Sequence, residues 1–317
     1  MSASTAGPVL VVIDPADETG VALARGRRLA ESLAAPLVLF ACEFDQAMEG
    51  SHFHVSERVE AARRARVAAS REWLEAQAGP LRQGGLRVEV EAVYANPRHE
   101  AIARHARKTR AALVVMAARR HEWLDRATLG AADWQLIRIC PTPLLLARDG
   151  NWPDTPRVLA AVDPSHRDDR HALLDHAILD QVEQLIKGLD AEAWVAHCVF
   201  SMASLESTAA LGMMPEALGA TPEDYAERLM KELRRAVLRL LEGRPIPGSR
   251  LRIAEGRPEK QLPRLVDDIG IDILVTGGVS RSRLEQVFIG GTAERLLDRV
   301  SCDLLVVKPP GFRSPLD

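Results

Sequence analysis

The chain has 317 residues, which is enough for two domains of average size, and 47% of them are hydrophobic, as in ordinary globular proteins. Its formal net charge of −3 argues against a nucleic-acid-binding surface. No apolar run approaches a membrane-spanning length, and the first residues lack the basic start and apolar core of a signal peptide, so we expect neither membrane insertion nor export.

The first half alternates short apolar runs with amphipathic segments, the pattern of a parallel sheet whose strands are joined by helices. Apolar runs predict strands at residues 9–13, 36–42, 86–93, 112–116 and 144–147. Helical spacing predicts helices at residues 18–34, 57–77, 97–108 and 133–139, with a loop at residues 43–56. Gly84 and Gly85 are expected to separate the second helix from the next strand.

The same order begins again after a polar, proline-rich linker at residues 151–156. Residues 158–164 closely resemble residues 9–15 in sequence, and residues 271–307 resemble residues 111–147. The difference in residue number between equivalent positions of the two copies increases along the chain. We therefore expect insertions in the first helix of the second copy and at residues 201–221. We infer an internal duplication, with a first domain at residues 1–150 and a second at residues 151–317.

Ligands of open α/β sheets sit beyond the carboxyl ends of the strands, where the second copy carries two notable residues. Asp163 follows the first strand of that copy and could hydrogen-bond an adenine or a ribose. It could equally do no more than begin a turn before Pro164. Gly256 precedes Arg257 and Pro258 and could line one wall of a site, but a plain turn with proline at the first helical position explains it as well.

A glycine-bearing loop follows the penultimate strand of the second copy. Gly277 and Gly290 would let a backbone without Cβ wrap closely around a phosphate chain. Thr292, after Gly291, lies where the next helix should start, so its hydroxyl could cap the first amides or help to bind a phosphate. Glycine spacing alone favours a simpler interpretation, in which these glycines only shape turns.

The first copy keeps an aspartate, Asp14, at the corresponding strand end but loses the glycines. Ala117 stands in place of Gly277, and Arg120 stands where the second copy has Ser280. A Cβ and a long side chain would crowd the same space, so we infer that the first copy has lost phosphate binding.

Other candidate chemistry is weak. His52 and His54 have no nearby carboxylate or thiol and supply only half a zinc site, so we expect a loop there and no metal. His197 and Cys198 are adjacent on a strand and face opposite ways, which disfavours a catalytic pair. No GxSxG or P-loop motif occurs, and we expect no catalytic residue.

The four cysteines are far apart without a CxxC, which favours buried thiols in a reducing cytoplasm.

Taken together, these residues resemble the universal stress protein family, and within it the tandem two-domain E type. The family motif is Gly-x2-Gly-x9-Gly followed by Ser, Thr or Asn, and the match here is Gly277-x2-Ser280-x9-Gly290-Gly291-Thr292. It departs from the motif twice, because Ser280 replaces a glycine and the hydroxyl falls one position late. Further matches lie along the chain, at Val11-Val12-Ile13-Asp14-Pro15, Cys140-Pro141, Gly256-Arg257-Pro258 and Cys302-Asp303-Leu304.

The resemblance implies an α/β protein with two tandem, doubly wound, parallel five-stranded sheets, the adenine-nucleotide alpha-hydrolase-like fold. It also implies ATP or AMP, with or without Mg²⁺, in competent copies, and association through the last strands, as in a homodimer. The adenine-side aspartate of the family falls on Asp163, the phosphate-loop glycines fall on Gly277 and Gly290, and Thr292 approximates the hydroxyl position. Members of this type act in cytoplasmic stress resistance and are not established as turnover enzymes.

Two alternatives stay open. The chain could be a slow ATPase or phosphotransferase that uses the pocket at Thr292, since a hydroxyl there would stand at a helix N-terminus beside a phosphate loop. It could instead carry a non-nucleotide, acyl-bearing ligand in a cavity lined by the apolar insert around Met202 and Met213. A helical lid packed on the core would explain that insert more simply.

Overall fold

Short apolar runs in the first half of the chain form a parallel sheet. Its strands are β1 (Val9–Val12), β2 (Leu37–Glu43), β3 (Val88–Tyr94), β4 (Leu113–Ala117) and β5 (Leu144–Ala147). They lie in the order β3-β2-β1-β4-β5, and every neighbouring pair is parallel. All four residues of β1 are buried, as expected for a central strand that has helices on both faces.

The second half repeats this arrangement. Its strands are β6 (Arg157–Ala161), β7 (Glu192–Val199), β8 (Leu251–Glu255), β9 (Ile273–Gly277) and β10 (Asp303–Val307). They are parallel and lie in the order β8-β7-β6-β9-β10. The repeated order confirms the predicted fold class of two tandem parallel five-stranded sheets.

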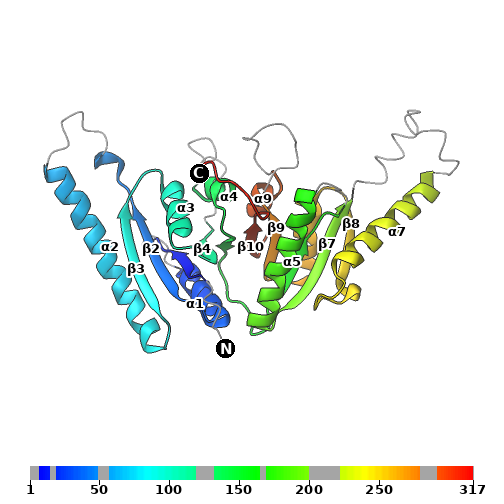
Figure 1. Cartoon of the computed structure of the whole chain (residues 1–317), viewed down its shortest axis with the longest axis horizontal. Coiled ribbons are helices and arrows are strands. Elements are labelled where there is room, and N and C mark those ends of the chain that lie inside the picture. The colour runs from blue at the N-terminus through cyan, green and yellow to red at the C-terminus, as the bar shows by residue number, and fades with distance from the viewer. Residues whose placement is uncertain are drawn as a thin grey trace. The chain divides into compact units, whose positions relative to one another are not determined.

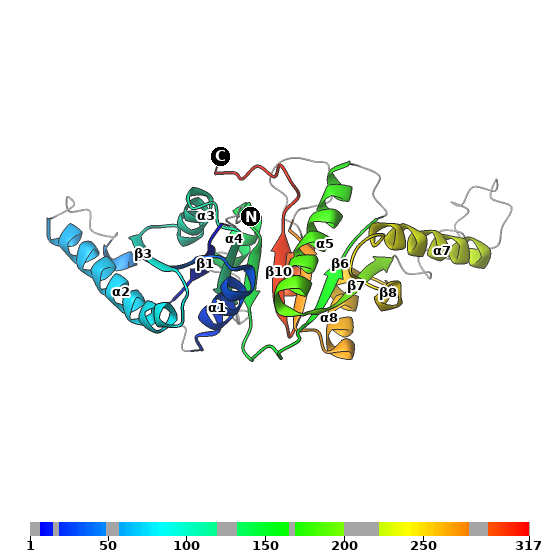
Figure 2. The ribbon, with the colours of Figure 1, turned by 60° about the horizontal axis from the view of Figure 1, so that its bottom comes forward.

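The helices of the first half are α1 (Val21–Leu33), α2 (Glu57–Gln83), α3 (Arg98–Lys108) and α4 (Ala132–Ile139). Those of the second half are α5 (Asp169–Leu189), α7 (Pro222–Leu240), α8 (Pro258–Ile269) and α9 (Gly291–Leu297). In each sheet the chain first runs towards one edge and then returns to the other, so right-handed crossovers place the first two helices on one face and the last two on the other. Accordingly α3 packs on α4, and α8 packs on α9. Figure 1 shows α2 lying along β3, and Figure 2 shows α5 in front of β6.

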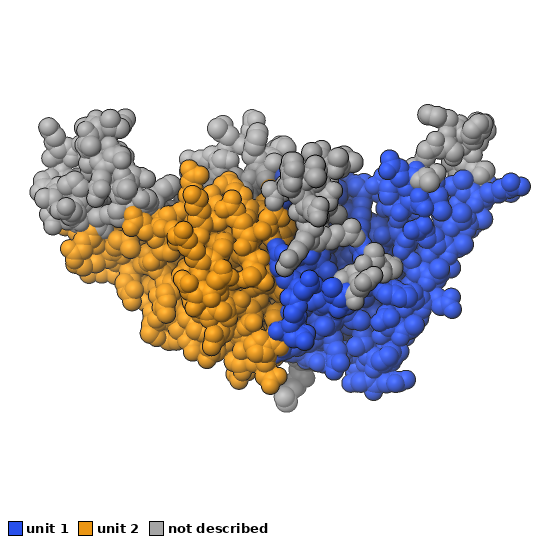
Figure 3. Space-filling model, turned by 180° about the vertical axis from the view of Figure 1, so that it is seen from behind, with its two compact units in different colours: residues 1–151, 312–317 blue, residues 152–311 orange. Residues whose placement is uncertain are grey.

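The computed structural model describes residues 7–14, 19–48, 57–118, 132–164, 169–199, 222–278 and 291–316. At residues 47, 132–133, 169–172, 222–226 and 291 it describes the backbone alone. The chain divides into a first unit, residues 1–151 with 312–317, and a second unit, residues 152–311 (Figure 3). The last six residues, which the sequence pattern assigns to the second domain, thus group with the first unit, where the Ser314 hydroxyl donates to the Ile139 carbonyl.

Helix α2 is longer than its sequence pattern predicts. The pattern predicts an end at residue 77, but the helix continues through Pro80 to Gln83. Proline removes a helical hydrogen bond, and the burial of Leu74 and Ala78 outweighs that loss as the helix packs along β3. The helix ends directly before Gly84 and Gly85, the two glycines expected to separate it from the next strand, and Gly85 has a φ of 92°.

The predicted insertion in the first helix of the second copy is confirmed. Helix α5 has 21 residues where α1 has 13. The remaining insertion falls between β7 and β8, a stretch that includes residues 200–221, which lie outside the described part of the chain. The apolar insert around Met202 and Met213 therefore stays a prediction.

All four cysteines are free thiols. Cys140 and Cys302 are buried as predicted, whereas Cys42 and Cys198 are half-buried. Burial raises the pKa of the Cys42 thiol, against the opposing effect of the Arg98 charge, so this thiol stays protonated at neutral pH.

His105 lies in the core of the first unit. Its ring stacks on Phe40, with 4.6 Å between ring centroids, and its buried Nε2 atom has no hydrogen-bond partner among the described residues. Burial lowers the pKa of His105, the Glu91 charge opposes that shift, and the Lys108 charge adds to it. The folded chain therefore favours the neutral imidazole.

We expect His105 to make the first unit less stable in acid. In the unfolded chain this group takes up a proton near its ordinary pKa of about 6.5, whereas the folded chain resists protonation. The free energy of unfolding should therefore fall as the pH drops below that value. The variant His105→Phe keeps a ring on Phe40 and should lose less stability as the pH falls from neutral into mild acid, as measured by urea unfolding. Equal losses in both proteins would contradict this assignment.

Candidate functional site

The carboxyl ends of the parallel strands of the second unit meet at one edge of its sheet. The chain leaves β6 towards β7 and later returns to the other side of β6 as β9, so the strand order reverses between β6 and β9. Such a switch point is where open α/β sheets bind ligands. Asp163 follows the end of β6 by two residues, and Gly277 is the last residue of β9, so the structure brings these two predicted residues to adjacent strand ends.

The peptide group between Val162 and Asp163 is held from both sides. Its N–H, on Asp163, donates to Oδ1 of Asp175 at 3.0 Å. Its carbonyl oxygen, on Val162, lies 3.1 Å from Nδ1 of His197. Because a carbonyl oxygen only accepts hydrogen bonds, Nδ1 of His197 carries the proton in this contact. Asp175 and His197 are 4% and 3% exposed, so the arrangement is shielded from water.

His197 also lies beside the carboxylate of Asp163, with 3.7 Å between Nδ1 and Oδ1. The sequence pattern suggests this histidine only as a partner of Cys198, and strand alternation disfavours that pair. The signal for its true neighbour lies in the strand register, because Ala161 pairs with Ala196, which directly precedes His197.

The two glycines at the end of β9 have close neighbours. A Cβ on Gly277 would lie 2.6 Å from Cδ2 of Leu174, so this glycine lets α5 pack closely on the strand. A Cβ on Gly278 would lie 2.5 Å from Cγ1 of Val306 and 3.0 Å from Nζ of Lys308. The buried Lys308 ammonium donates to the carbonyl of Gly278. Close packing against Leu174 therefore explains why a glycine stands at position 277. A contact between Gly277 and phosphate stays a prediction.

Gly256 follows β8, which is separated from β6 by β7. Its φ of +124° is a conformation that other residues rarely adopt, and its N–H donates to the carbonyl of Val199. Pro258 is the first residue of α8, as the turn interpretation predicts. A Cβ on Gly256 would meet the side chain of Gln261 at 2.7 Å. These observations explain Gly256 as a turn, and its place in a ligand-site wall stays a prediction.

The rest of the predicted loop is described only at its end. Ser280 and Gly290 lie outside the described residues. Gly291 is the first residue of α9, so Thr292 lies inside the first turn rather than before it. The sequence pattern predicts Thr292 at the start of the helix, and the difference is one residue.

Glu259 links the helices that follow β8 and the loop. The Arg295 guanidinium of α9 donates to Oε1 of Glu259 at 3.0 Å, and Arg299 donates to the Glu259 carbonyl. Burial alone would raise the pKa of Glu259. Hydrogen bonds from its own backbone N–H and from Arg295, with the charges of Arg295 and Arg257, lower that pKa below its ordinary value. The carboxylate therefore stays ionised and holds α8 and α9 together.

The matching edge of the first unit is built differently. Oδ2 of Asp14 lies 2.7 Å from Nη1 of Arg98, the first residue of α3. The first residue of the corresponding helix α8 is Pro258, which carries no charge. Ala117 ends β4 where Gly277 ends β9. Arg120 lies outside the described residues.

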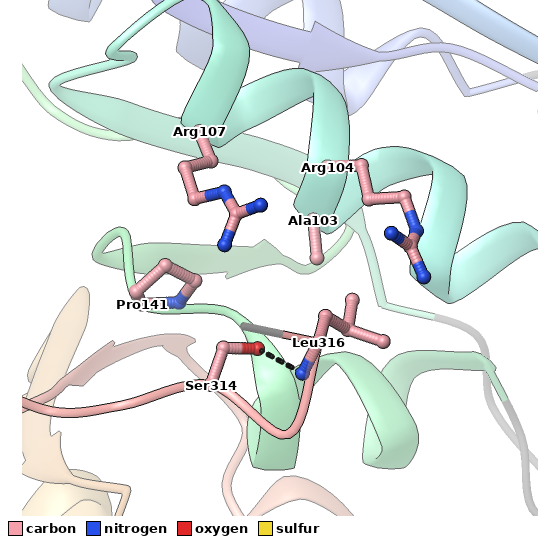
Figure 4. A pocket seen from close by; sticks show the side chains of 6 residues that line it. All are labelled: Ala103, Arg104, Arg107, Pro141, Ser314 and Leu316. Carbon is pink, nitrogen blue, oxygen red and sulfur yellow. Dashed lines mark hydrogen bonds between the residues drawn. The ribbon is translucent and has the colours of Figure 1, made fainter.

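A shallow hollow lies in the first unit between α3 and the end of the chain. Figure 4 shows its lining, which consists of Ala103, Arg104, Arg107, Pro141, Ser314 and Leu316. The backbone N–H of Leu316 donates to the Ser314 hydroxyl there. The hollow contains none of the predicted site residues, and we assign it no ligand.

Within the described ranges, no group of three histidine, cysteine or acidic side chains is placed to hold a metal ion. His52 and His54 lie outside those ranges. No helix in the described part of the chain is long and apolar enough to cross a membrane.

Comparison with known proteins agrees with this architecture. The model of the universal stress protein family matches residues 6–148 and again residues 155–308. The chain therefore belongs to the universal stress protein family, with two family domains in tandem. The arrangement is that of the E type. Universal stress protein E of Photorhabdus laumondii is 27% identical over 308 residues, covering 97% of this chain and 96% of that protein.

Other relatives also match this chain over nearly its full length. Universal stress protein E of Escherichia coli K12 is 25% identical over 309 residues, covering 98% of this chain and 96% of that protein. A crystal structure of a functionally unknown Pseudomonas aeruginosa protein has a TM-score of 0.71 at 24% identity, covering 96% of this chain and 93% of that chain. A universal stress protein from Archaeoglobus fulgidus has a TM-score of 0.62 at 15% identity, with coverages of 96% and 97%. These two structures support the fold.

Proposed function

We propose that the chain is a cytoplasmic, nucleotide-binding regulatory protein of stress resistance, with ATP or AMP held by the second unit. In this proposal the first unit is structural and the protein is not a turnover enzyme. Family membership supports a role in the stress response, and the four free thiols suit a reducing compartment.

One observation carries the choice of the second unit. At its switch point, Asp163 stands at the end of β6 beside Gly277 at the end of β9. A carboxylate accepts hydrogen bonds from an amine or a hydroxyl, such as those of adenosine. Glycines beside it let a backbone come close to a ligand.

The same edge of the first unit supports a structural role. The ion pair between Asp14 and Arg98 occupies the carboxylate that would correspond to Asp163. The proposal needs no second copy of the chain, because the residues that carry it all lie in one unit.

Binding rather than turnover suits the polar groups at the switch point. Nδ1 of His197 is committed to the Val162 carbonyl, and Oδ1 of Asp175 is committed to the Asp163 N–H. These two atoms therefore hold the backbone beside Asp163, which suits a binding site. A slow ATPase remains the second hypothesis, and phosphate release measured beside binding would reveal it.

Calorimetric titration of the full chain with ATP and with AMP tests the proposal. We expect one nucleotide to bind per chain with either ligand. Two nucleotides per chain would contradict the structural role of the first unit. An absence of heat from both titrations, together with an unchanged melting temperature, would contradict nucleotide binding itself.

A further inference from the structure

The peptide group before Asp163 is clamped at both of its polar atoms. His197 donates to its carbonyl oxygen, and Asp175 accepts from its N–H. A peptide unit is planar, so fixing both ends fixes the direction in which the next residue leaves it. The clamp therefore fixes the position of the Cα atom of Asp163, from which the carboxylate extends.

The first unit cannot form the carbonyl side of this clamp from the equivalent strand position. Val12 pairs with Phe40 as Ala161 pairs with Ala196, so the residue that corresponds to His197 is Ala41. An alanine side chain has no hydrogen-bond donor. The neighbours of the two aspartates differ as well. Asp14 forms an ion pair with Arg98, whereas Asp163 lies beside His197.

We propose that His197 and Asp175 are positioning residues that aim the Asp163 carboxylate at a hydrogen-bond donor of the ligand. This inference rests on the proposed function, because it assumes that the second unit binds a nucleotide. The donor recognised would be an N–H or O–H group, which adenosine offers on its exocyclic amine and on its ribose hydroxyls. His197 acts through Asp163 and does not itself need to touch the ligand.

The test compares two amide variants in the full chain. Asparagine places an amide N–H close to the position of the histidine Nδ1, whereas glutamine places it further out. We expect His197→Asn to bind ATP within about threefold of the unaltered protein and His197→Gln to bind about tenfold more weakly, in proportion to one lost hydrogen bond. Cys198→Ser, the next residue on β7, is the matched control and should bind normally.

Ligand selectivity separates positioning from a general loss of fold. ITP lacks the amine of ATP, and 2′-deoxyATP lacks one ribose hydroxyl, so the two ligands distinguish the two sources of the donor. If His197 positions Asp163, one of the two analogues should bind more weakly than ATP to the unaltered protein. The ratio of the affinity for ATP to the affinity for that analogue should then be smaller in His197→Gln. A ratio that stays constant while all affinities fall would overturn the positioning role.

The outcomes separate the two proposals. If the unaltered protein binds no nucleotide, the proposed function fails. If it binds ATP and the Asn and Gln variants have equal affinities, the proposed function stands and the positioning role of His197 is overturned.

Discussion

Replacement of Asp163 by asparagine should weaken ATP binding to the full chain by about 10- to 100-fold. A hydrogen bond to a charged group contributes about 1.5–3 kcal/mol, and about 1.4 kcal/mol corresponds to a factor of ten in affinity. Asparagine keeps the size of the side chain and the backbone N–H that donates to Asp175. Calorimetric titration of the variant with ATP measures the loss.

Asp14→Asn is the matched control for this substitution. Asp14 follows the equivalent strand of the first unit and forms an ion pair with Arg98. If the nucleotide binds in the second unit, this variant should bind ATP as the unaltered protein does. Equal weakening by the two substitutions would contradict the assignment, as would normal binding by Asp163→Asn.

Replacement of Leu274 by alanine should destabilise the second unit by about 2–5 kcal/mol, the usual cost of truncating a buried leucine. Leu274 is fully buried in β9, between Leu159 of β6 and Leu304 of β10. The cavity would open in the strand that ends at Gly277. Urea unfolding followed by circular dichroism measures the shift, with the transitions of the two units fitted separately.

The control for the core substitution is Leu173→Ala on α5. Leu173 is 45% exposed, and substitutions at such positions usually change stability by less than about 0.5 kcal/mol. A similar cost for the two leucines would contradict the burial of Leu274 in the core of the second unit.

Most of the fold could be predicted from the sequence, because short apolar runs between amphipathic segments are a strong local signal. The duplication, the strand sequence and the proline at the start of α8 all follow from patterns within a few residues. Local patterns are wrong where packing overrides local preference. Pro80 should end a helix by its own chemistry, but the buried side of α2 carries the helix past it.

The candidate site was only partly predictable, because its key contacts join residues far apart in the chain. Asp163 could be chosen from its place after a strand, but its neighbour His197 comes from another strand and becomes visible only in the register. The ion pair between Asp14 and Arg98 spans 84 positions and has no local signature. Leu174, which packs on Gly277, likewise comes from a helix that sequence patterns could not orient.

The sharpest check on nucleotide binding by the second unit is photo-crosslinking with 8-azido-ATP, followed by mass spectrometry of the digested full chain. The azide sits on the adenine ring and marks the residues beside it. We predict labelled peptides from the second unit, at the strand ends near Asp163, and their loss when excess ATP competes. Competable labels confined to the first unit would show that the nucleotide site has been assigned to the wrong half of the chain.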